Sequence, residues 1–329
     1  MITYHSITTN TQQKEFKMIS YTPEQADVLE LVVTTDGIVL VEAGAGTGKS
    51  FMSRQIVQEL NVKSGLYTAF NKAIVEEGVD RFYGTPIECK TFHALAYKYV
   101  KPKISIESFS YKCITEKIIY SEKRRIIDLL DAFFVSGSTC MYTFFSEELK
   151  DHPRKDYMET IAEKYVLGMV EGTVHPTFNF LLKYLHLMMV EGTAVIETDI
   201  VILDEINDVT AVSLEIFRLI KAPKKLGLGE TNQAIYEFLN LVNGFEVLKD
   251  EATTLRFTQS YRCSKAIAER IEKTMKSVLN PDFSFKGTDK PVENGKTLYC
   301  TLTNAMIVDE IKNRLEKGKG FTLLRKPSD

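Results

Sequence analysis

The stretch VEAGAGTGKSF, at residues 41–51, decides the fold. It follows the apolar run GIVLV at residues 37–41, and a helical pattern continues from it over residues 50–60. Its three glycines allow backbone N–H groups to turn inward around a chain of phosphates. A strand before the loop, a helix after it and a Lys-Ser pair at its end predict a phosphate-binding loop rather than an ordinary glycine-rich turn.

The loop pattern predicts roles for its individual residues. Lys49 is expected to reach the β and γ phosphates of a nucleotide, and the helix that begins near it adds the positive end of its dipole. The Ser50 hydroxyl is expected to ligate Mg²⁺. The loop residues predicted to bind the nucleotide are Ala43, Gly44, Ala45, Gly46, Thr47, Gly48, Lys49 and Ser50.

A pair of carboxylates follows a second apolar run. DIVIL at residues 199–203 reads as a buried strand, and Asp204 and Glu205 come directly after it. Ligands of open α/β sheets bind at the carboxyl ends of the strands. Asp204 is expected to hold Mg²⁺, directly or through water, and Glu205 to orient and deprotonate the attacking water. An acidic pair at a helix N-terminus is the alternative, and the phosphate-binding loop upstream favours the metal-binding interpretation.

Other apolar runs indicate the fold class. GLYTAF at residues 65–70 and KLGLG at residues 225–229 are short, and helical patterns such as residues 212–220 lie between the runs. Strands that alternate with helices indicate an α/β fold, with a parallel sheet covered on both faces. Residues 101–188 carry few strand signals, and apolar residues recur there at helical spacing, so a helical insertion is expected.

Strand patterns return in the last part of the chain. They are TTLRF at residues 253–257, TLYCT at residues 297–301 and FTLL at residues 321–324. These runs indicate a second α/β unit that begins near residue 251. The sequence stops shortly after the last run, so this second unit is expected to be incomplete.

Composition and charge limit the class of protein. The formal net charge is −3, and the five cysteines show no metal-binding spacing. No apolar run is long enough to span a bilayer and no signal-peptide pattern opens the chain, so a cytoplasmic protein without a membrane partner is expected (in the host cytoplasm, if viral). Residues 98–125 hold eight lysines and arginines against three glutamates. A surface that tracks nucleic-acid phosphates is one interpretation, and a solvated helix face is the one that charge alone favours.

Six stretches resemble, in the same order, the motifs of superfamily 1 helicases of the UvrD/Rep type, and most of all those of the F-box DNA helicase branch. They are YTPEQADVLEL at 21–31, TAFNKAI at 68–74, KTFHALAY at 90–97, ILDEIND at 202–208, GLGETNQAIYEF at 227–238 and LRFTQSYRCSKAIA at 255–268. Six motifs in one order are far more specific than any single motif. The resemblance implies a RecA-like P-loop NTPase.

The resemblance also implies a division of the chain. Residues 1–100 and 189–250 are expected to form a discontinuous RecA-like domain that binds ATP. Residues 101–188 are expected to form a helical insertion that contacts DNA. Residues 251–329 are expected to begin a second, incomplete RecA-like domain.

Three residues outside the loop gain nucleotide-related roles from the resemblance. Gln25 matches the glutamine that hydrogen-bonds adenine, although a surface glutamine explains it equally well. Gln233 matches the glutamine that senses the γ-phosphate and couples it to DNA. Arg262 matches the arginine that reaches the γ-phosphate from the second domain, and a surface ion pair is its alternative. The predicted catalytic set is therefore Lys49, Glu205, Gln233 and Arg262.

A further group matches the positions that touch single-stranded DNA in this family. Its members are Phe70, Asn71, Thr91, Phe92, His93 and Tyr236. Tyr236 is expected to stack on a base, which contributes about 1–3 kcal/mol, and a core tyrosine is the alternative. For His93, a hydrogen-bonded polar group in the core is an equally good interpretation.

The chain departs from the family pattern at several points. Ile206 and Asn207 stand where alanine or phenylalanine and then glutamine are usual, and Glu230 stands where aspartate is usual. The altered side-chain lengths are expected to affect the coupling between hydrolysis and DNA. The last two motifs of the family, including one that supplies a second arginine, have no match in the sequence.

The expected function is an ATP-dependent DNA helicase or translocase. It would use ATP and Mg²⁺ and act on single-stranded DNA, or on a duplex with a single-stranded tail, and the resemblance implies 3′-to-5′ movement. The missing motifs keep open a nucleic-acid-binding module that binds ATP as a switch without unwinding. A small-molecule kinase built on the same loop is less well supported, because it leaves residues 91–97 and 233–236 without a role.

Overall fold

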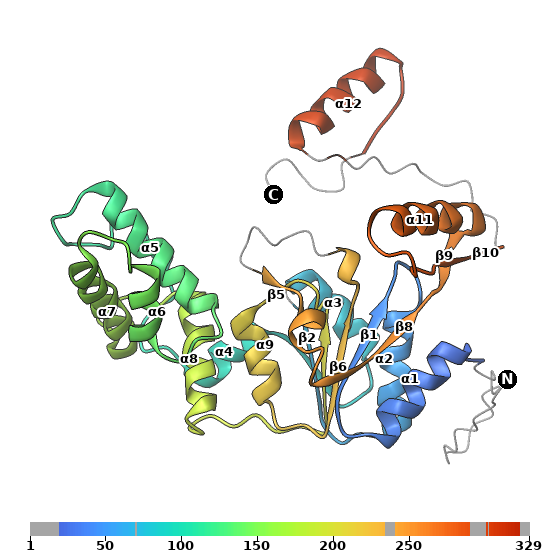
Figure 1. Cartoon of the computed structure of the whole chain (residues 1–329), viewed down its shortest axis with the longest axis horizontal. Coiled ribbons are helices and arrows are strands. Elements are labelled where there is room, and N and C mark those ends of the chain that lie inside the picture. The colour runs from blue at the N-terminus through green and yellow to red at the C-terminus, as the bar shows by residue number, and fades with distance from the viewer. Residues whose placement is uncertain (1–19, 70, 234–240, 290–300, 302, 323–329) are drawn as a thin grey trace. The chain divides into compact units, whose positions relative to one another are not determined.

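The computed structural model describes residues 20–69, 71–233, 241–289, 301 and 303–322 (Figure 1). The chain forms two compact units, Met1–Thr288 and Asp289–Asp329. The first unit contains a six-stranded sheet, and the second contains helix α12 (Asn304–Glu316). In the described part of the chain, no helix has both the length and the apolar composition that crossing a membrane requires.

The sheet has the strand order β3-β2-β4-β6-β1-β8, and each pairing within it is parallel. Its strands are β1 (Gly37–Ala43), β2 (Gly65–Ala69), β3 (Ile87–Thr91), β4 (Ile200–Asp204), β6 (Lys224–Gly229) and β8 (Ala252–Phe257). Every residue of β2 and β4 is buried, as in strands covered on both faces. The α/β fold with a parallel sheet is therefore confirmed.

The helices of the first unit are α1 (Pro23–Thr34), α2 (Lys49–Leu60), α3 (Lys72–Arg81), α4 (Phe92–Val100), α5 (Tyr120–Val135), α6 (Met141–Glu148), α7 (Lys155–Glu171), α8 (Phe178–Val190), α9 (Ala211–Leu219), α10 (Gly244–Val247) and α11 (Lys265–Val278). The shorter elements are β5 (Val209–Thr210), β7 (Leu241–Val242), β9 (Gln259–Ser264), β10 (Lys286–Thr288) and the 3₁₀ turn η1 (Thr231–Gln233). Side chains of Thr22, Asn71 and Thr177 accept hydrogen bonds from first-turn N–H groups and so begin α1, α3 and α8.

Helices cover both faces of the sheet (Figure 1). On one face α1, α2 and α3 share a hydrophobic cluster with Val39 and Val41 of β1. On the other face α4, α8 and α9 belong to a larger cluster that includes Leu40. Neighbouring residues of β1 thus enter opposite cores, because successive side chains of a strand point to opposite faces.

The segment between β3 and β4 is helical, as its periodicity predicts. Helix α7 buries the expected apolar residues, namely Met158, Ile161, Ala162, Tyr165, Val166 and Met169. These residues belong to the same cluster as Leu203 of β4, so the helical segment and the sheet share one core. Lys183 of α8 is buried, and its Nζ donates to the carbonyl oxygens of Ser136 and Ser138, each at 2.7 Å. These bonds satisfy carbonyl groups just after the end of α5.

The strand TTLRF does not begin a second domain. It forms β8, which pairs with β1 along the register from Ile38–Ala252 to Ala43–Phe257. The boundary expected at residue 251 is therefore wrong for this strand, because its hydrogen-bonding partner lies in the first sheet. The chain leaves that sheet only after Phe257.

The next elements form a small group of their own. Strands β9 and β10 pair in parallel, and α11 packs on them around Phe283 and Phe285. Of the two later strand patterns, residues 297–300 and 323–324 lie outside the described residues. Thr301, Phe321 and Thr322 belong to no strand.

The shared core predicts that a cavity in the helical segment destabilises the first unit. Leu182 of α8 is fully buried, so Leu182→Ala is expected to lower the free energy of unfolding by about 2–5 kcal/mol. Urea denaturation followed by circular dichroism measures this loss.

The control is Leu167→Ala on α7, where the side chain is 42% exposed. This variant is expected to lose less than about 1 kcal/mol, because little buried surface is removed. Equal losses in the two variants would contradict the shared core.

Candidate functional site

The phosphate-binding loop connects β1 to α2, and two of its three glycines have left-handed backbone conformations. Gly46 has φ +73° and Gly48 has φ +98°, which residues with a Cβ rarely adopt. Gly44 O accepts hydrogen bonds from both the backbone N–H and the hydroxyl of Thr47, at 3.2 and 2.8 Å. Gly48 caps α2 without a side-chain hydrogen bond. The first N–H groups of α2 are therefore available to an anion.

Strand β9 lies directly against this loop. Ser260 Oγ donates to Ala45 O at 2.8 Å, and the backbone N–H of Tyr261 donates to Gly46 O at 2.8 Å. A Cβ on Gly46 would overlap with the Cβ of Arg262, so only glycine permits this approach. Arg262 thus lies beside the loop, and its guanidinium makes no hydrogen bond or ion pair with any described residue.

Lys49 and Glu205 form the central ion pair of the site. Lys49 Nζ lies 3.2 Å from Glu205 Oε1, and both side chains are partly exposed. Glu205 has φ +54°, and a left-handed backbone costs a residue with a side chain about 1–2 kcal/mol. Hydrogen bonds on both sides hold this turn, from Ile206 N to Leu228 O at 2.9 Å and from Asp208 N to Glu205 O at 3.0 Å. The turn directs the Glu205 carboxylate toward Lys49.

Asp204 ends β4 at the same edge of the sheet and is buried. Its Oδ1 accepts from the backbone N–H of Glu205 at 3.1 Å, and its Oδ2 accepts from Tyr67 and Arg81. Burial, followed by the charge of Asp204, raises the pKa of the Tyr67 hydroxyl. That hydroxyl therefore remains a proton donor at neutral pH.

The oxygen atoms at the loop fit Mg²⁺ better than a softer metal. Ser50 is exposed, and its hydroxyl makes no hydrogen bond with the described residues. Together with the Asp204 carboxylate it supplies hard oxygen ligands, and Mg²⁺ usually takes few protein ligands and keeps water and phosphate oxygens. No group of three or more His, Cys, Asp or Glu suited to a metal occurs among the described residues.

Asn207 and Glu230, two of the departures from the family pattern, contact each other. The buried Asn207 Oδ1 accepts from the backbone N–H of Glu230 at 3.0 Å. A Cβ at position 229 would overlap with this oxygen, so the glycine there leaves the space that the Asn207 amide occupies. Glu230 accepts a hydrogen bond from Gln233 Nε2, and burial raises the pKa of its carboxyl group. Gln233 is thereby tied to the end of β6 through Glu230.

Gln25 is not a surface glutamine, because only 4% of it is exposed. It forms a capping box with Thr22, in which Gln25 Oε1 accepts from Thr22 N at 3.1 Å. This bond fixes the orientation of the amide, and Nε2 lies 3.2 Å from where a Cβ on Gly48 would stand. The amide donor of Gln25 therefore lies against the phosphate-binding loop.

The residues expected to contact DNA have different environments. Asn71 and Thr91 follow or end β2 and β3, and their side chains cap α3 and α4. Phe92 is 4% exposed and packs in the large core cluster, which corrects the expectation of a direct DNA contact from this ring. His93 Nε2 lies 3.1 Å from Asn179 Oδ1, so this histidine has a polar partner. Phe70 and Tyr236 lie outside the described residues.

Phe178 is an aromatic residue that the sequence interpretation missed. Its ring is 55% exposed at the start of α8 and meets His93 edge-on, with ring centroids 6.1 Å apart. An apolar residue just after the N-cap Thr177 looks like part of the buried face of α8 in sequence. Only the packing of α8 on α4 reveals that it is exposed beside His93 of the KTFHALAY motif.

The basic residues between 98 and 125 are largely paired. Lys98 lies 3.2 Å from Glu88 Oε2, and Arg124 lies 3.0 Å from Asp128 Oδ1. Lys123 Nζ donates to a backbone carbonyl oxygen. These contacts support the interpretation of the stretch as a solvated surface.

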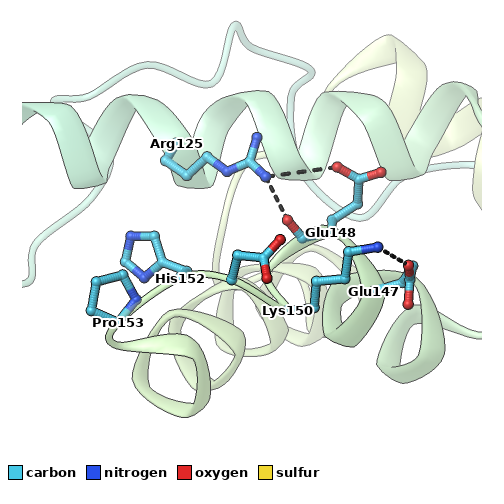
Figure 2. A pocket seen from close by; sticks show the side chains of 7 residues that line it. Arg125, Glu147, Glu148, Lys150, His152 and Pro153 are labelled. Carbon is cyan, nitrogen blue, oxygen red and sulfur yellow. Dashed lines mark hydrogen bonds and ion pairs between the residues drawn. The ribbon is translucent and has the colours of Figure 1, made fainter.

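A pocket of about 450 Å³ lies on the helical segment and is lined by charged side chains (Figure 2). Its charged groups bind one another, with Arg125 Nη2 2.6 Å from Glu148 O and Lys150 Nζ 2.6 Å from Glu147 Oε1. No residue of the phosphate-binding loop lines this pocket. The pocket and the phosphate-binding loop are therefore separate features of the surface.

The comparisons with known proteins agree with this arrangement. A family model described as an AAA domain matches residues 25–239, well over half of the chain. The chain belongs to this family. F-box DNA helicase 1 of Gallus gallus is 25% identical over 283 residues, which cover 76% of this chain and 27% of that protein. The chain thus spans little more than a quarter of that relative, and the resemblance to UvrD/Rep-type helicases of the F-box DNA helicase branch is confirmed.

The approach of β9 to the loop predicts the effect of a single methyl group. Gly46→Ala is expected to displace β9 and to weaken nucleotide binding by more than about tenfold, or about 1.4 kcal/mol. Titration with a fluorescent ADP derivative measures the affinity.

Gly84→Ala is the matched control for this substitution. Gly84 has φ +77°, so alanine there bears the same backbone strain, but its Cβ would meet no atom within 4 Å. Nucleotide affinity is expected to stay at the wild-type value. An equal loss in both variants would assign the effect to strain rather than to β9.

Proposed function

We propose that this protein is an ATP-dependent DNA helicase or translocase that moves along single-stranded DNA, in the 3′-to-5′ direction that its family resemblance implies. The observation that carries the proposal is the meeting of Lys49, Glu205 and Arg262 at one phosphate-binding loop. These groups come from α2, the end of β4 and β9. Their convergence supports nucleotide hydrolysis better than passive binding.

Each charged group has a distinct part in the proposed hydrolysis. Lys49 exchanges Glu205 for the β and γ phosphates, which frees the Glu205 carboxylate to accept a proton from the attacking water. Mg²⁺, held by Ser50 and Asp204, would neutralise phosphate charge. Arg262 would stabilise the charge that develops on the γ-phosphate. Gln25 would donate from Nε2 to the adenine ring.

Two features of the structure support coupling between the nucleotide and DNA: the position of the expected DNA-contacting residues, and the contacts of the loop with β9. Asn71, Thr91 and His93 follow or end β2 and β3, at the same edge of the parallel sheet as the loop. On the other side, Ser260 and Tyr261 join the loop to β9 and hence to α11. A change in the loop would therefore move β9, and repeated changes would step the protein along one strand.

Removing the loop lysine tests the hydrolytic part of this proposal. Lys49→Ala is expected to reduce ATP hydrolysis by at least about 100-fold, because the variant lacks the positive charge that stabilises the negative charge developing on the phosphates. Lys150→Ala, which breaks an exposed ion pair with Glu147, is the control and is expected to keep full activity. Phosphate release is measured with and without single-stranded DNA, and normal turnover of Lys49→Ala would exclude the assignment of the loop.

The same assay on the unmodified chain separates the two functional classes. Stimulation of hydrolysis by single-stranded DNA, followed by ATP-dependent separation of a tailed duplex, would support a motor. ATP binding without stimulated turnover would instead support a nucleic-acid-binding module in which ATP acts as a switch.

Phe178 tests the proposed DNA surface. Phe178→Ala is expected to weaken binding of single-stranded DNA by about 1–3 kcal/mol, the contribution of one stacked base. Fluorescence anisotropy at several salt concentrations measures the affinity. The slope of log affinity against log salt is expected to stay unchanged, because no charge is removed.

Tyr83→Ala is the control for this loss of an exposed ring. Tyr83 is 82% exposed and precedes β3, so it lies at the opposite edge of the sheet from His93. DNA affinity is expected to remain at the wild-type value. The DNA surface would be misplaced if Tyr83→Ala weakened binding as much as Phe178→Ala.

A further inference from the structure

Three polar side chains from three elements meet at the end of β4. Tyr67 of β2 donates from its hydroxyl to Asp204 Oδ2 at 2.6 Å. Arg81, at the end of α3, donates from Nη1 to the same Oδ2 at 3.2 Å and to the Tyr67 oxygen at 3.2 Å. Tyr67 is fully buried and Asp204 nearly so. None of the proposed chemical steps uses Tyr67 or Arg81.

The surrounding residues make room for this arrangement. A Cβ on Gly78 would overlap with the Tyr67 ring, so the ring occupies space that only glycine leaves free. Glycine inside a helix costs about 1 kcal/mol relative to alanine. The Phe82 ring also packs against Tyr67, with ring centroids 5.2 Å apart. Helix α3 therefore carries an unfavourable residue at the point where the Tyr67 ring must fit.

The direction of the hydrogen bonds distinguishes positioning from simple burial. Both long-range donors bind Oδ2, whereas among the described residues Oδ1 accepts only the adjacent N–H of Glu205, at 3.1 Å. A carboxylate held at one oxygen by two donors has a fixed rotamer and presents its other oxygen in one direction. Oδ1 therefore keeps a lone pair for a further ligand.

We infer that Tyr67 and Arg81 are positioning residues that hold Asp204 so that Oδ1 faces the water shell of Mg²⁺. The inference rests on the proposed function, because it takes Asp204 as the metal-binding carboxylate. The two residues touch neither substrate nor metal and act only through Asp204. Arg81 also pairs its positive charge with the buried Asp204 carboxylate, with Nη1 3.2 Å from Oδ2.

The test is the Mg²⁺ dependence of nucleotide binding in the full chain. Tyr67→Phe removes one hydroxyl and keeps the ring, so the packing against Gly78 and Phe82 stays. The Mg²⁺ concentration at which binding of fluorescent ADP is half-maximally strengthened is expected to rise about tenfold or more. Binding without Mg²⁺ is expected to stay at the wild-type value. Arg81→Lys is expected to shift the Mg²⁺ midpoint in the same direction.

Tyr165→Phe is the matched control, because it also breaks a tyrosine–carboxylate bond. Tyr165 is buried in the helical segment, and its hydroxyl donates to Glu116 Oε2 at 2.6 Å. This variant is expected to lose stability in urea but to keep the wild-type Mg²⁺ midpoint.

The possible outcomes separate the inference from the proposed function. An unchanged Mg²⁺ midpoint in Tyr67→Phe, with stability lost as in Tyr165→Phe, would make the cluster purely structural and overturn the inference alone. Nucleotide binding by the wild type that does not respond to Mg²⁺ would overturn both. A shifted midpoint in Tyr67→Phe and Arg81→Lys, but not in Tyr165→Phe, supports the positioning role.

Discussion

The parallel pairing of β1 with β6 on one side and β8 on the other is the constraint on which the site depends. All strands of a parallel sheet end at one edge, so the loop after β1, Asp204 at the end of β4 and the turn after β6 meet there. β8 then brings β9 to the same edge, where Ser260 binds the loop. The strand order thus assembles groups that are far apart in the chain.

Sequence reasoning reached those parts of the site that are continuous in the chain. The glycine spacing and Lys49 identify the loop, and an apolar run followed by two carboxylates identifies the end of β4. It missed the features that depend on contacts between residues far apart in the chain. β8 looks like the start of a domain because its partner β1 lies about 214 residues earlier, as the Arg256–Glu42 pair shows. Phe92 belongs to a DNA-binding pattern, yet the packing of α4 on α8 buries it.

The buried polar groups of this fold connect loops that carry chemistry. Asn207 joins the turn after β4 to the end of β6, and Tyr67 joins β2 to β4. Such bonds are worth only about 0.5–1.5 kcal/mol each in net stability, but an unpaired buried group costs more. Their main effect is therefore to exclude alternative arrangements of the same loops. Asparagine at 207 is long enough to make the bond that joins these two loops.

The backbone of Glu205 has a consequence for how this chain can change over time. An asparagine tolerates the left-handed conformation better than a glutamate, so Glu205→Asn would relieve part of the strain at φ +54°. It would also withdraw the carboxylate from Lys49, since the side chain is shorter and uncharged. Selection for stability alone would thus favour losing the glutamate. The strained turn therefore lowers stability while it keeps a carboxylate against Lys49.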